Sequence, residues 1–430
     1  MNEQIDSQKK PSRKKYIIAA VIILCILAGY IYKVVTWTPI DSDAQKASEA
    51  IIRQAVAIQL NKDPNKLNDN DFAQITKLDL GTGQRVGRVI LYRKPGQELT
   101  DIRILEKFTN LQELNLSSIK YPDKNIPKWM TILVKFGIYD VEKRFAINLN
   151  PLTNLSALKS LRLSNSQIYD LTPIKKLINL QELHIDRTLV SDLEPVMALK
   201  NLQKLSISGT QISDLDAIER LTNLKNLIIY DNPVSNLKPI KELKNLQQLA
   251  INHTQISNLE PINGLIKLQV LDITDNSISD LGPIKSLTNL NSLVLTSNPV
   301  SDIKPLMGLE NLEELVMYFT QVSDLEPLSR LTKLESLGIG QTQVSDLEPI
   351  KGLTNLTFLS ISETHVSNLE PLKGFINLGD LDISGSQVSD LEPLKELKNL
   401  KIISVGGCEN ITDDQIEELQ KALTNLTIYR

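Results

Sequence analysis

The sequence repeats itself every 22 residues over most of its length. Twelve strand-like triplets of the form Leu-x-Ile, or a close apolar variant, follow one another at that spacing without a break. They begin at Leu161, Leu183, Leu205, Leu227, Leu249, Leu271, Leu293, Leu315, Leu337, Leu359, Leu381 and Ile403. A fixed period of this size is the signature of stacked repeats, in which each unit contacts only its neighbours. Twelve copies in register therefore predict an elongated solenoid rather than an ordinary globular domain.

Within one repeat the apolar residues occupy fixed positions. In one unit they are Leu180, Leu183, Ile185, Val190, Leu193, Val196 and Leu199. A single repeat is too small to bury this stripe alone, whereas stacked copies form a continuous core beside a parallel sheet. We therefore expect these residues to point inward and the residues between them to face water.

Two rows of polar residues recur with the same period. The first row consists of Ser166, Thr188, Thr210, Asn232, Thr254, Asn276, Asn298, Thr320, Thr342, Thr364, Ser386 and Cys408. Short polar side chains of this kind form hydrogen bonds with nearby backbone groups, so we expect them to support the turn after each strand.

The second row consists of Asp170, Asp192, Asp214, Asn236, Asn258, Asp280, Asp302, Asp324, Asp346, Asn368 and Asp390. Ten of these eleven residues have Pro three positions later, and the exception is Asp214, which has Ala217 there. An Asx cap followed by Pro predicts a short helical turn, which the small number of residues favours as 3-10. An aspartate row also suggests calcium, but we interpret it as capping because each carboxylate has backbone donors to satisfy.

The consensus LxxLxIxxTxVSDLxPLxxLxN resembles the leucine-rich repeat, in the 22-residue form of bacterial internalin-type proteins. The resemblance covers residues 158–405 without a break and residues 41–430 more loosely. It implies an α/β solenoid: a right-handed coil with a concave parallel β-sheet, short 3-10 turns on the convex side and helical caps at both ends. The pattern is specific for a fold and says little about function.

The ends of the array differ from its middle. Residues 36–113 are expected to hold a linker, a helical N-terminal cap (helices over 44–60 and 68–75) and a first strand over 77–80. At the other end, residues 406–430 are expected to form a capping repeat. Thr412 and Gln415 have the spacing of a capping box that opens a helix there.

One segment interrupts the period. Residues 114–157 form a first repeat in which the step from Leu114 to Leu161 is 47 residues, because 119–150 are inserted. The insertion is rich in aromatic residues and either packs as part of the cap or forms a recognition loop. A second irregular stretch, 81–98, is expected to be a hairpin-like excursion.

The N-terminal segment predicts a membrane anchor. Residues 1–15 form a basic tail, and an apolar stretch interrupted only by Lys33 follows over 16–35, close to the length of a transmembrane helix. The cations before it outnumber those just after it, so the positive-inside rule predicts a cytoplasmic N-terminus and an extracytoplasmic repeat domain, in the periplasm or at the cell surface. A cleaved signal peptide and a buried core helix are the alternatives.

Composition and motifs narrow the chemistry. The net charge of −4 gives no basic footprint for nucleic acid. One of the two cysteines, Cys25, lies in the apolar stretch, so no disulfide framework is expected. The three histidines are interpreted as solvated surface residues. With no HExxH, CxxC or GxSxG motif, we expect no enzyme, no metal site, no cofactor and no small-molecule substrate.

The register predicts which strand residues face outward: the one between Leu and Ile, and the two after Ile. Most are small or polar, but six are large and apolar: Ile228, Tyr230, Val294, Val316, Tyr318 and Phe319. Asp186, Asp231, Asp272, Asp275, Glu363 and Asp382 add an acidic tendency against Arg162 and Arg187. Aromatic residues on a rigid face are typical of interface hot spots, and β-propensity alone is the competing explanation.

These features favour a membrane-anchored extracytoplasmic scaffold that binds a protein through its concave sheet. Two other functions remain open at this stage. One is a passive structural element of the envelope, and the other is an enzyme whose site lies in the insertion.

Overall fold

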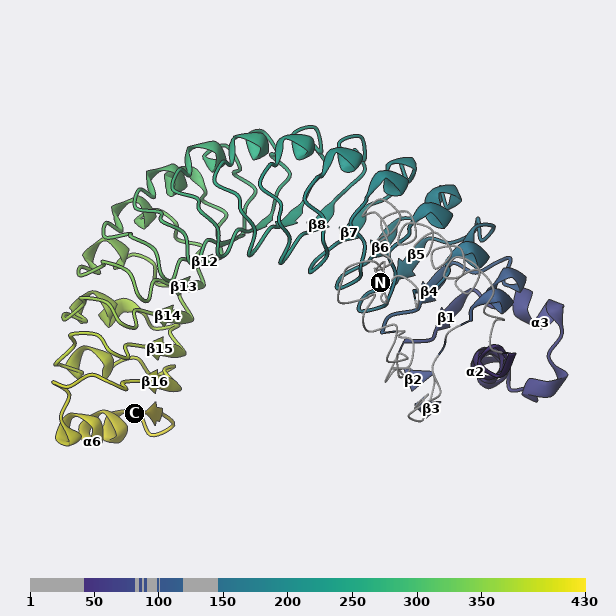
Figure 1. The fold of residues 1–430 in the computed structure, drawn as a ribbon. Coiled ribbons are helices and arrows are strands. Elements are labelled where there is room, and N and C mark those ends of the chain that lie inside the picture. Colours follow the sequence, from purple (N-terminus) through teal and green to yellow (C-terminus); the bar gives the residue numbers. More distant parts are fainter. Residues whose placement is uncertain (1–41, 82–84, 87–88, 91–98, 100, 119–145) are drawn as a thin grey trace, which may run out of the picture.

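The computed structural model describes residues 42–81, 85–86, 89–90, 99, 101–118 and 146–430. Within them, fifteen short strands lie side by side in one parallel sheet whose order follows the sequence. Figure 1 shows this sheet bent into an arch, with the strands on the inner, concave side and 3-10 helices on the outer, convex side. The predicted solenoid with a concave parallel sheet is confirmed.

Each strand of the sheet is three residues long and is centred on the repeated leucine or its apolar equivalent. The strands are β1 (Lys77–Asp79), β4 (Glu113–Asn115), β5 (Ser160–Arg162), β6 (Glu182–His184), β7 (Lys204–Ser206), β8 (Asn226–Ile228), β9 (Gln248–Ala250), β10 (Val270–Asp272), β11 (Ser292–Val294), β12 (Glu314–Val316), β13 (Ser336–Gly338), β14 (Phe358–Ser360), β15 (Asp380–Asp382), β16 (Ile402–Ser404) and β17 (Thr427–Tyr429). The predicted triplets began at the central residue, so the strands start one residue earlier than the sequence indicated.

The long step in the period leaves the sheet intact. Leu114 of β4 pairs directly with Leu161 of β5, and Leu78 of β1 pairs with Leu114. A separate antiparallel pair, β2 (Arg85–Val86) and β3 (Val89–Ile90), matches the expected hairpin. Residues 119–145 of the insertion lie outside the described residues, so its role as cap or recognition loop stays a prediction.

The core is a set of apolar columns that run the length of the arch. All seven apolar residues of the repeat from Leu180 to Leu199 are at most 3% exposed, as predicted. Burying one such side chain contributes about 1.5–3 kcal/mol, and the same position is filled in every repeat. The stacked repeats therefore share one continuous hydrophobic core.

The convex side consists of 3-10 helices of three to five residues, as the proline pattern predicted. In the repeats they are η4 (Thr172–Lys176), η5 (Glu194–Ala198), η6 (Asp216–Ile218), η7 (Lys238–Ile240), η8 (Glu260–Ile262), η9 (Gly282–Ile284), η10 (Lys304–Gly308), η11 (Glu326–Leu328), η12 (Glu348–Ile350), η13 (Glu370–Gly374) and η14 (Glu392–Leu394). Before them come η1 (Pro64–Lys66), η2 (Arg103–Lys107) and η3 (Asn150–Leu152).

The aspartate and asparagine row starts these helices. In all eleven repeats the Asx Oδ1 accepts the backbone N–H two residues later, at 2.7–2.9 Å. The capping role is confirmed with one correction. The N-cap residue itself is the following apolar residue, such as Leu171, so the Asx side chain closes a turn just outside the helix.

The row of short polar residues bonds the backbone, as predicted. Each threonine hydroxyl donates to the carbonyl three residues before it, at 2.7–3.1 Å. Asn232, Asn276 and Asn298 reach back and donate to a carbonyl of the preceding repeat, at 2.8–2.9 Å. Asn276 and Asn298 also donate to the carbonyl three residues before them, at 3.0 and 3.1 Å. The buried Cys408 thiol takes the same place and donates to the Ile383 carbonyl at 3.0 Å.

A third polar row, the asparagine that ends the repeat consensus, was given no role in the sequence analysis. Asparagines just before the strands donate Nδ2 to a carbonyl of the preceding repeat, at 2.7–3.1 Å. The row comprises Asn110, Asn179, Asn201, Asn223, Asn245, Asn289, Asn311, Asn355, Asn377 and Asn399. Lys267 and Lys333 interrupt it, and each donates to the asparagine one repeat earlier at 2.7 Å.

Helices cover both ends of the described array. At the N-terminal end, α2 (Ser42–Leu60) buries Ile52 and Val56, and α3 (Asp69–Ala73) buries Phe72, whose ring lies 5.2 Å from that of Phe108. At the other end, α6 (Asp413–Ala422) begins with the predicted capping box of Thr412 and Gln415. These helices shield the end repeats of the core from water.

The predicted anchor over 16–35 and the basic tail before it lie outside the described residues. Among the helices that the structure does describe, none has the length and apolar character needed to cross a bilayer.

Removing the Asn298 side chain should destabilise the central repeats. Asn298 is 2% exposed, donates to the Ile273 carbonyl and accepts the Ile278 N–H at 3.0 Å. Asn298→Ala leaves these two groups without a side-chain partner and should lower the free energy of unfolding by about 2–3 kcal/mol. Urea unfolding followed by circular dichroism measures the loss.

Asn298→Thr is the matched control. Thr320, one repeat on, donates to its own repeat at 2.9 Å. A threonine at 298 should therefore restore part of the stability without restoring the bond to Ile273. Equal unfolding curves for wild type and Asn298→Ala would contradict the role of this row.

Candidate binding surface

Four residues of each repeat line the inner side of the arch. The residues one before and one after the central leucine point to the concave side because side chains alternate along a strand. The third residue after the leucine also points to the concave side. At the fourth residue after the leucine the chain turns away from the sheet. For β8 the four are Asn226, Ile228, Tyr230 and Asp231. We call these four positions in β4 to β16 the concave face.

The fourth position of the concave face always has left-handed backbone. Its φ lies between 51° and 73° at Ser118, Asn165, Arg187, Gly209, Asp231, His253, Asp275, Ser297, Phe319, Gln341, Glu363, Gly385 and Gly407. Glycine adopts this conformation freely, and Asn and Asp tolerate it better than most residues. Phe319 is therefore unusual there, and its ring is 57% exposed on the border of the face.

The structure divides the six predicted hot-spot residues into two groups. Val294 and Val316 are paired neighbours on β11 and β12, and Tyr318 and Phe319 follow on the same repeat. Ile228 lies on β8 and Tyr230 follows it, three strands away from β11, which corresponds to about 14 Å. All except Phe319 are half-buried. Their binding role stays a prediction.

Tyr318 lies along the sheet instead of projecting from it. Gly338 and Gly340 of the next repeat leave a slot, and a Cβ built on Gly338 would come within 2.8 Å of the Tyr318 ring. Burial and the charges of Asp382 and Asp380 raise the pKa of Tyr318, while a hydrogen bond with Ser360 opposes this shift. Tyr318 therefore presents a flat aromatic surface flush with the strands.

One position of the concave face was not predicted from the sequence. Because the strands start one residue earlier than predicted, the residue before the leucine also points to the concave side of the arch. This position is occupied by Glu314 on β12, Phe358 on β14 and Asp380 on β15. The Phe358 side chain is half-buried. Extending the period-two alternation backwards by one residue would have found all three.

Several acids of the concave face are held by local hydrogen bonds. The Asp186 carboxylate accepts bonds from the Ser164 and Ser206 hydroxyls and from the Ser208 N–H. Asp272 accepts one from the Asn252 amide at 2.6 Å. These contacts orient the carboxylates without neutralising their charge.

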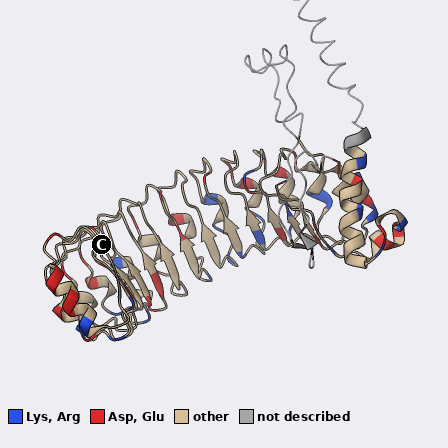
Figure 2. Cartoon of the chain, turned by 90° about the horizontal axis from the view of Figure 1, so that it is seen from below, with Lys and Arg blue, Asp and Glu red and all other residues tan. Residues whose placement is uncertain are grey.

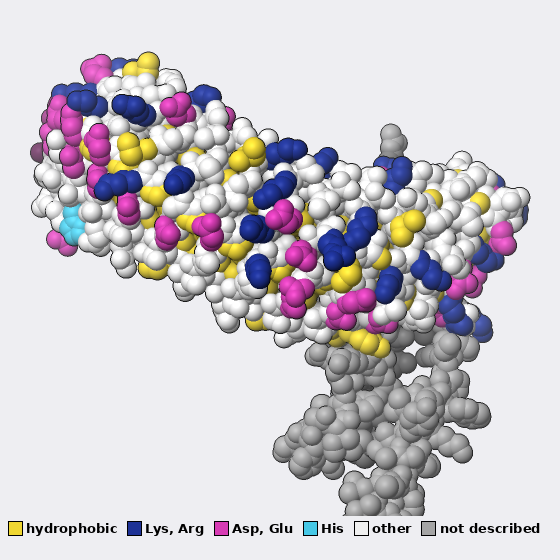
Figure 3. All heavy atoms as spheres, turned by 90° about the horizontal axis from the view of Figure 1, so that it is seen from above, with side chains coloured by type: hydrophobic (Ala, Val, Ile, Leu, Met, Phe, Trp, Pro, Cys, Tyr) yellow, Lys and Arg dark blue, Asp and Glu magenta, His cyan; other side chains and the backbone are white. Residues whose placement is uncertain are grey.

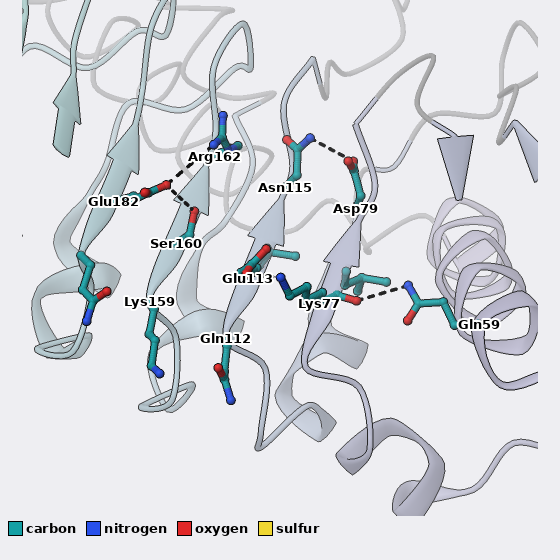
Figure 4. Close-up of a pocket in the computed structure, with 13 residues that line it drawn as sticks. Gln59, Lys77, Asp79, Gln112, Glu113, Asn115, Lys159, Ser160, Arg162 and Glu182 are labelled. Atoms are coloured by element: carbon teal, nitrogen blue, oxygen red, sulfur yellow. Dashed lines mark hydrogen bonds and ion pairs between the residues drawn. The ribbon is translucent and has the colours of Figure 1, made fainter. Parts of the chain in front are cut away.

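A hollow of about 730 Å³ opens at the N-terminal end of the face, over β1 and β4 to β6. Figure 4 shows that its floor consists of paired polar groups. Lys77 contacts Glu113 at 2.6 Å, and Glu182 meets both Lys204 at 3.0 Å and Arg162 at 3.7 Å. Burial alone would raise the pKa of Glu182, but the Lys204 hydrogen bond and these cations lower it. The charges of this hollow are thus balanced internally.

His184 differs from the solvated residue that the sequence analysis expected. It is half-buried on β6, and its Nε2 is buried without a hydrogen-bond partner. Burial and the Arg162 charge lower its pKa despite the nearby carboxylates of Asp186 and Glu182. His253, in contrast, is exposed and its Nδ1 lies 2.5 Å from Asp275.

Comparison with known proteins agrees with this architecture. The sequence profile of the family described as Leucine Rich repeats (2 copies) matches residues 200–242, 244–286 and 266–308. A search of curated protein sequences gave no match.

Solved structures extend the likeness to most of the chain. An internalin, InlF, from Listeria monocytogenes is 27% identical, with a TM-score of 0.68 over 82% of this chain and 94% of that one. A leucine-rich-repeat protein from Leptospira interrogans is 22% identical, with a TM-score of 0.54 over 84% and 97%. The plant peptide hormone receptor RGFR1, in complex with RGF2, is 20% identical, with a TM-score of 0.56 over 76% and 52%. The fold is thus a leucine-rich-repeat solenoid of internalin-like build.

The lowered pKa of His184 makes a prediction about pH. In a proton NMR titration, the imidazole signal that disappears in His184→Asn should have its midpoint below the ordinary value of 6.5. The unfolded chain then binds this proton more readily than the folded one, so His184 lowers the free energy of unfolding as the pH falls through 6.5. A midpoint at or above 6.5 would contradict the burial of this ring.

Proposed function

We propose that this protein is a membrane-anchored scaffold that holds its solenoid outside the cytoplasm and binds a protein through the concave face. The observation that carries the proposal is the group formed by Val294, Val316, Tyr318 and Phe319, with Phe358 beside it across the slot. These large apolar side chains lie on the repeats of β11, β12 and β14 of one sheet, with the glycines of the β13 repeat between the last two. Large, partly exposed aromatic residues at neighbouring positions are typical of interface hot spots.

The rigidity of the sheet supports this use. Each strand from β4 to β16 has a parallel partner on both sides, and the polar rows bond one repeat to the next. A surface that is ordered before binding loses little conformational entropy when a partner docks. The plant receptor complex shares only the fold with this chain, so the argument for a protein partner comes from the side chains of the concave face.

The anchor belongs to the same proposal and rests on the sequence. The stretch over 16–35 has the apolar character and the basic N-terminal flank of a transmembrane helix. In this arrangement residues 1–15 face the cytoplasm, and the solenoid faces the periplasm or the cell surface. The described residues begin with α2 at Ser42, so the N-terminal cap of the solenoid follows this stretch closely in the sequence.

Substituting two tyrosines of the concave face should abolish capture of the partner. The full chain, expressed in its own cells and crosslinked with formaldehyde, is expected to retain a discrete partner protein. Tyr230→Ser with Tyr318→Ser should lose that partner without changing the circular dichroism spectrum, because both side chains are only half-buried. Mass spectrometry of the crosslinked complexes measures the outcome.

Tyr169→Ser is the matched control. Tyr169 is 43% exposed and lies outside the concave face. Its substitution should leave capture unchanged. Unchanged capture by the Tyr230 and Tyr318 double variant would place the binding site elsewhere, and no partner for the wild type would favour a passive structural role.

Cysteine labelling tests the topology. Ser301 is exposed, and Ser7 lies in the basic tail. In intact cells a membrane-impermeant maleimide should label Ser301→Cys and leave Ser7→Cys unlabelled, with wild type giving the background of Cys25 and Cys408. Labelling at position 7 alone would invert the proposed orientation, and loss of the first residues from the mature chain would indicate cleavage.

A further inference from the structure

The charge of the concave face changes along the arch. In β8 to β16, seven residues of the concave face are acidic: Asp231, Asp272, Asp275, Glu314, Glu363, Asp380 and Asp382. No Lys or Arg stands at any concave position of these nine strands. Lys225 and Lys401 stand one residue before their strands, at the edge of the sheet. Glu313 and Glu335 occupy the same position in other repeats and balance the charge of these lysines.

The strands before β8 differ in this respect. There Arg162, Arg187 and Lys204 stand on the same face, and Glu182 contacts two of them. Among the seven acids from β8 onward, the ion pairs in the described residues include only that of Asp275 with His253. The negative charge of this part of the face therefore has few internal counterions.

The convex side does not share the imbalance. Figure 3 shows Lys and Arg along the outer surface among acidic side chains. Several of these lysines form ion pairs within one turn. Lys351 pairs with Glu348, and Lys373 lies 2.7 Å from Glu370. Figure 2, which looks into the arch, shows coloured charges only sparsely on the strands. Paired charges on one side and unpaired acids on the other direct the negative field toward the concave side.

Asp380 and Asp382 show the effect of this imbalance. They stand two residues apart on β15 and point to the same side. Burial and the charge of Asp382 raise the pKa of Asp380. The Ser360 hydroxyl donates to Asp382 at 3.2 Å, and the charges of Asp382 and Asp380 also raise the pKa of Tyr318.

Aromatic rings lie among the acids. Tyr318 and Phe319 are on the repeat of β12, and Phe358 is on β14, while Glu314 and Glu363 stand on the same two repeats. The faces of aromatic rings attract ammonium and guanidinium groups, and carboxylates bind the same groups directly. Rings and acids on one rigid surface thus select for the same partner chemistry.

We propose that the concave face of β8 to β16 binds a positively charged protein segment, in which Lys or Arg alternate with aliphatic or aromatic side chains. The proposal rests on the proposed function and deepens it by naming the chemistry of the partner. The cations of the partner meet the seven acids, and its apolar side chains pack on Val294, Val316 and Phe319. Opposite charges across the interface speed association and exclude acidic competitors.

A peptide selection tests the inference. The probe is a phage-displayed library of random dodecapeptides, selected on the immobilised full chain. The enriched peptides should carry a net positive charge together with apolar residues, and their affinity should fall steeply as salt is raised. A synthetic peptide of the most enriched sequence then serves as the probe for variants.

Charge reversal on the concave face gives the decisive comparison. Glu314→Lys with Glu363→Lys should weaken that peptide about tenfold or more at low salt. Glu314→Gln with Glu363→Gln, which changes the fold least, should give a smaller loss in the same direction. The control, Glu310→Lys with Glu326→Lys, makes the same net charge change outside the concave face and should bind as wild type does.

The outcomes separate this inference from the proposed function. Neutral or acidic peptides that are lost in the Tyr230 and Tyr318 double variant would overturn the cationic partner and leave concave-face binding intact. Basic peptides that bind all the charge variants equally would also overturn the inference. Peptides insensitive to both the tyrosine and the glutamate changes would overturn both proposals.

Discussion

The structure depends on satisfying the backbone where each chain turns away from the sheet. A carbonyl at that turn is buried between two repeats and out of reach of water, so it needs a donor from the protein. Threonine supplies the donor from within its own repeat, whereas asparagine and Cys408 reach back to the repeat before. The bonds of asparagine and Cys408 also join neighbouring repeats. Because every one of these carbonyls needs a donor, this polar row contains only short polar side chains and a thiol.

The shape of the arch follows from the two kinds of element that it joins. Parallel strands set the inner spacing of the repeats, at about 4.8 Å. The outer side is built of 3-10 helices, which are slimmer than α-helices but wider than a strand. The sheet must therefore be the shorter, inner side, and the side chains along it converge on one concavity. Proline in the first turn and an Asx side chain before it fix where the outer helices begin.

Much of this was predictable because a 22-residue period leaves few alternatives. The strands to within one residue, the two polar rows, the 3-10 helices and both terminal helices followed from the sequence. The asparagine row is part of the repeat consensus, but its role was not predicted because its partners are carbonyls of the preceding repeat. Phe358 was missed because the Leu-x-Ile pattern begins one residue after the strand does. Tyr318 could not be placed from its own repeat, since Gly338 and Gly340 in the next one decide where its ring lies.

The left-handed residue at the end of each concave strand restricts how this surface can diversify. None of the thirteen residues there is Val, Ile or Thr, in keeping with the crowding that a branched Cβ suffers at positive φ. Size and charge vary freely at the same position, from glycine to arginine, glutamate and phenylalanine. Evolution can thus retune the rim of the arch one repeat at a time, drawing on unbranched side chains, without disturbing the hydrophobic columns behind it.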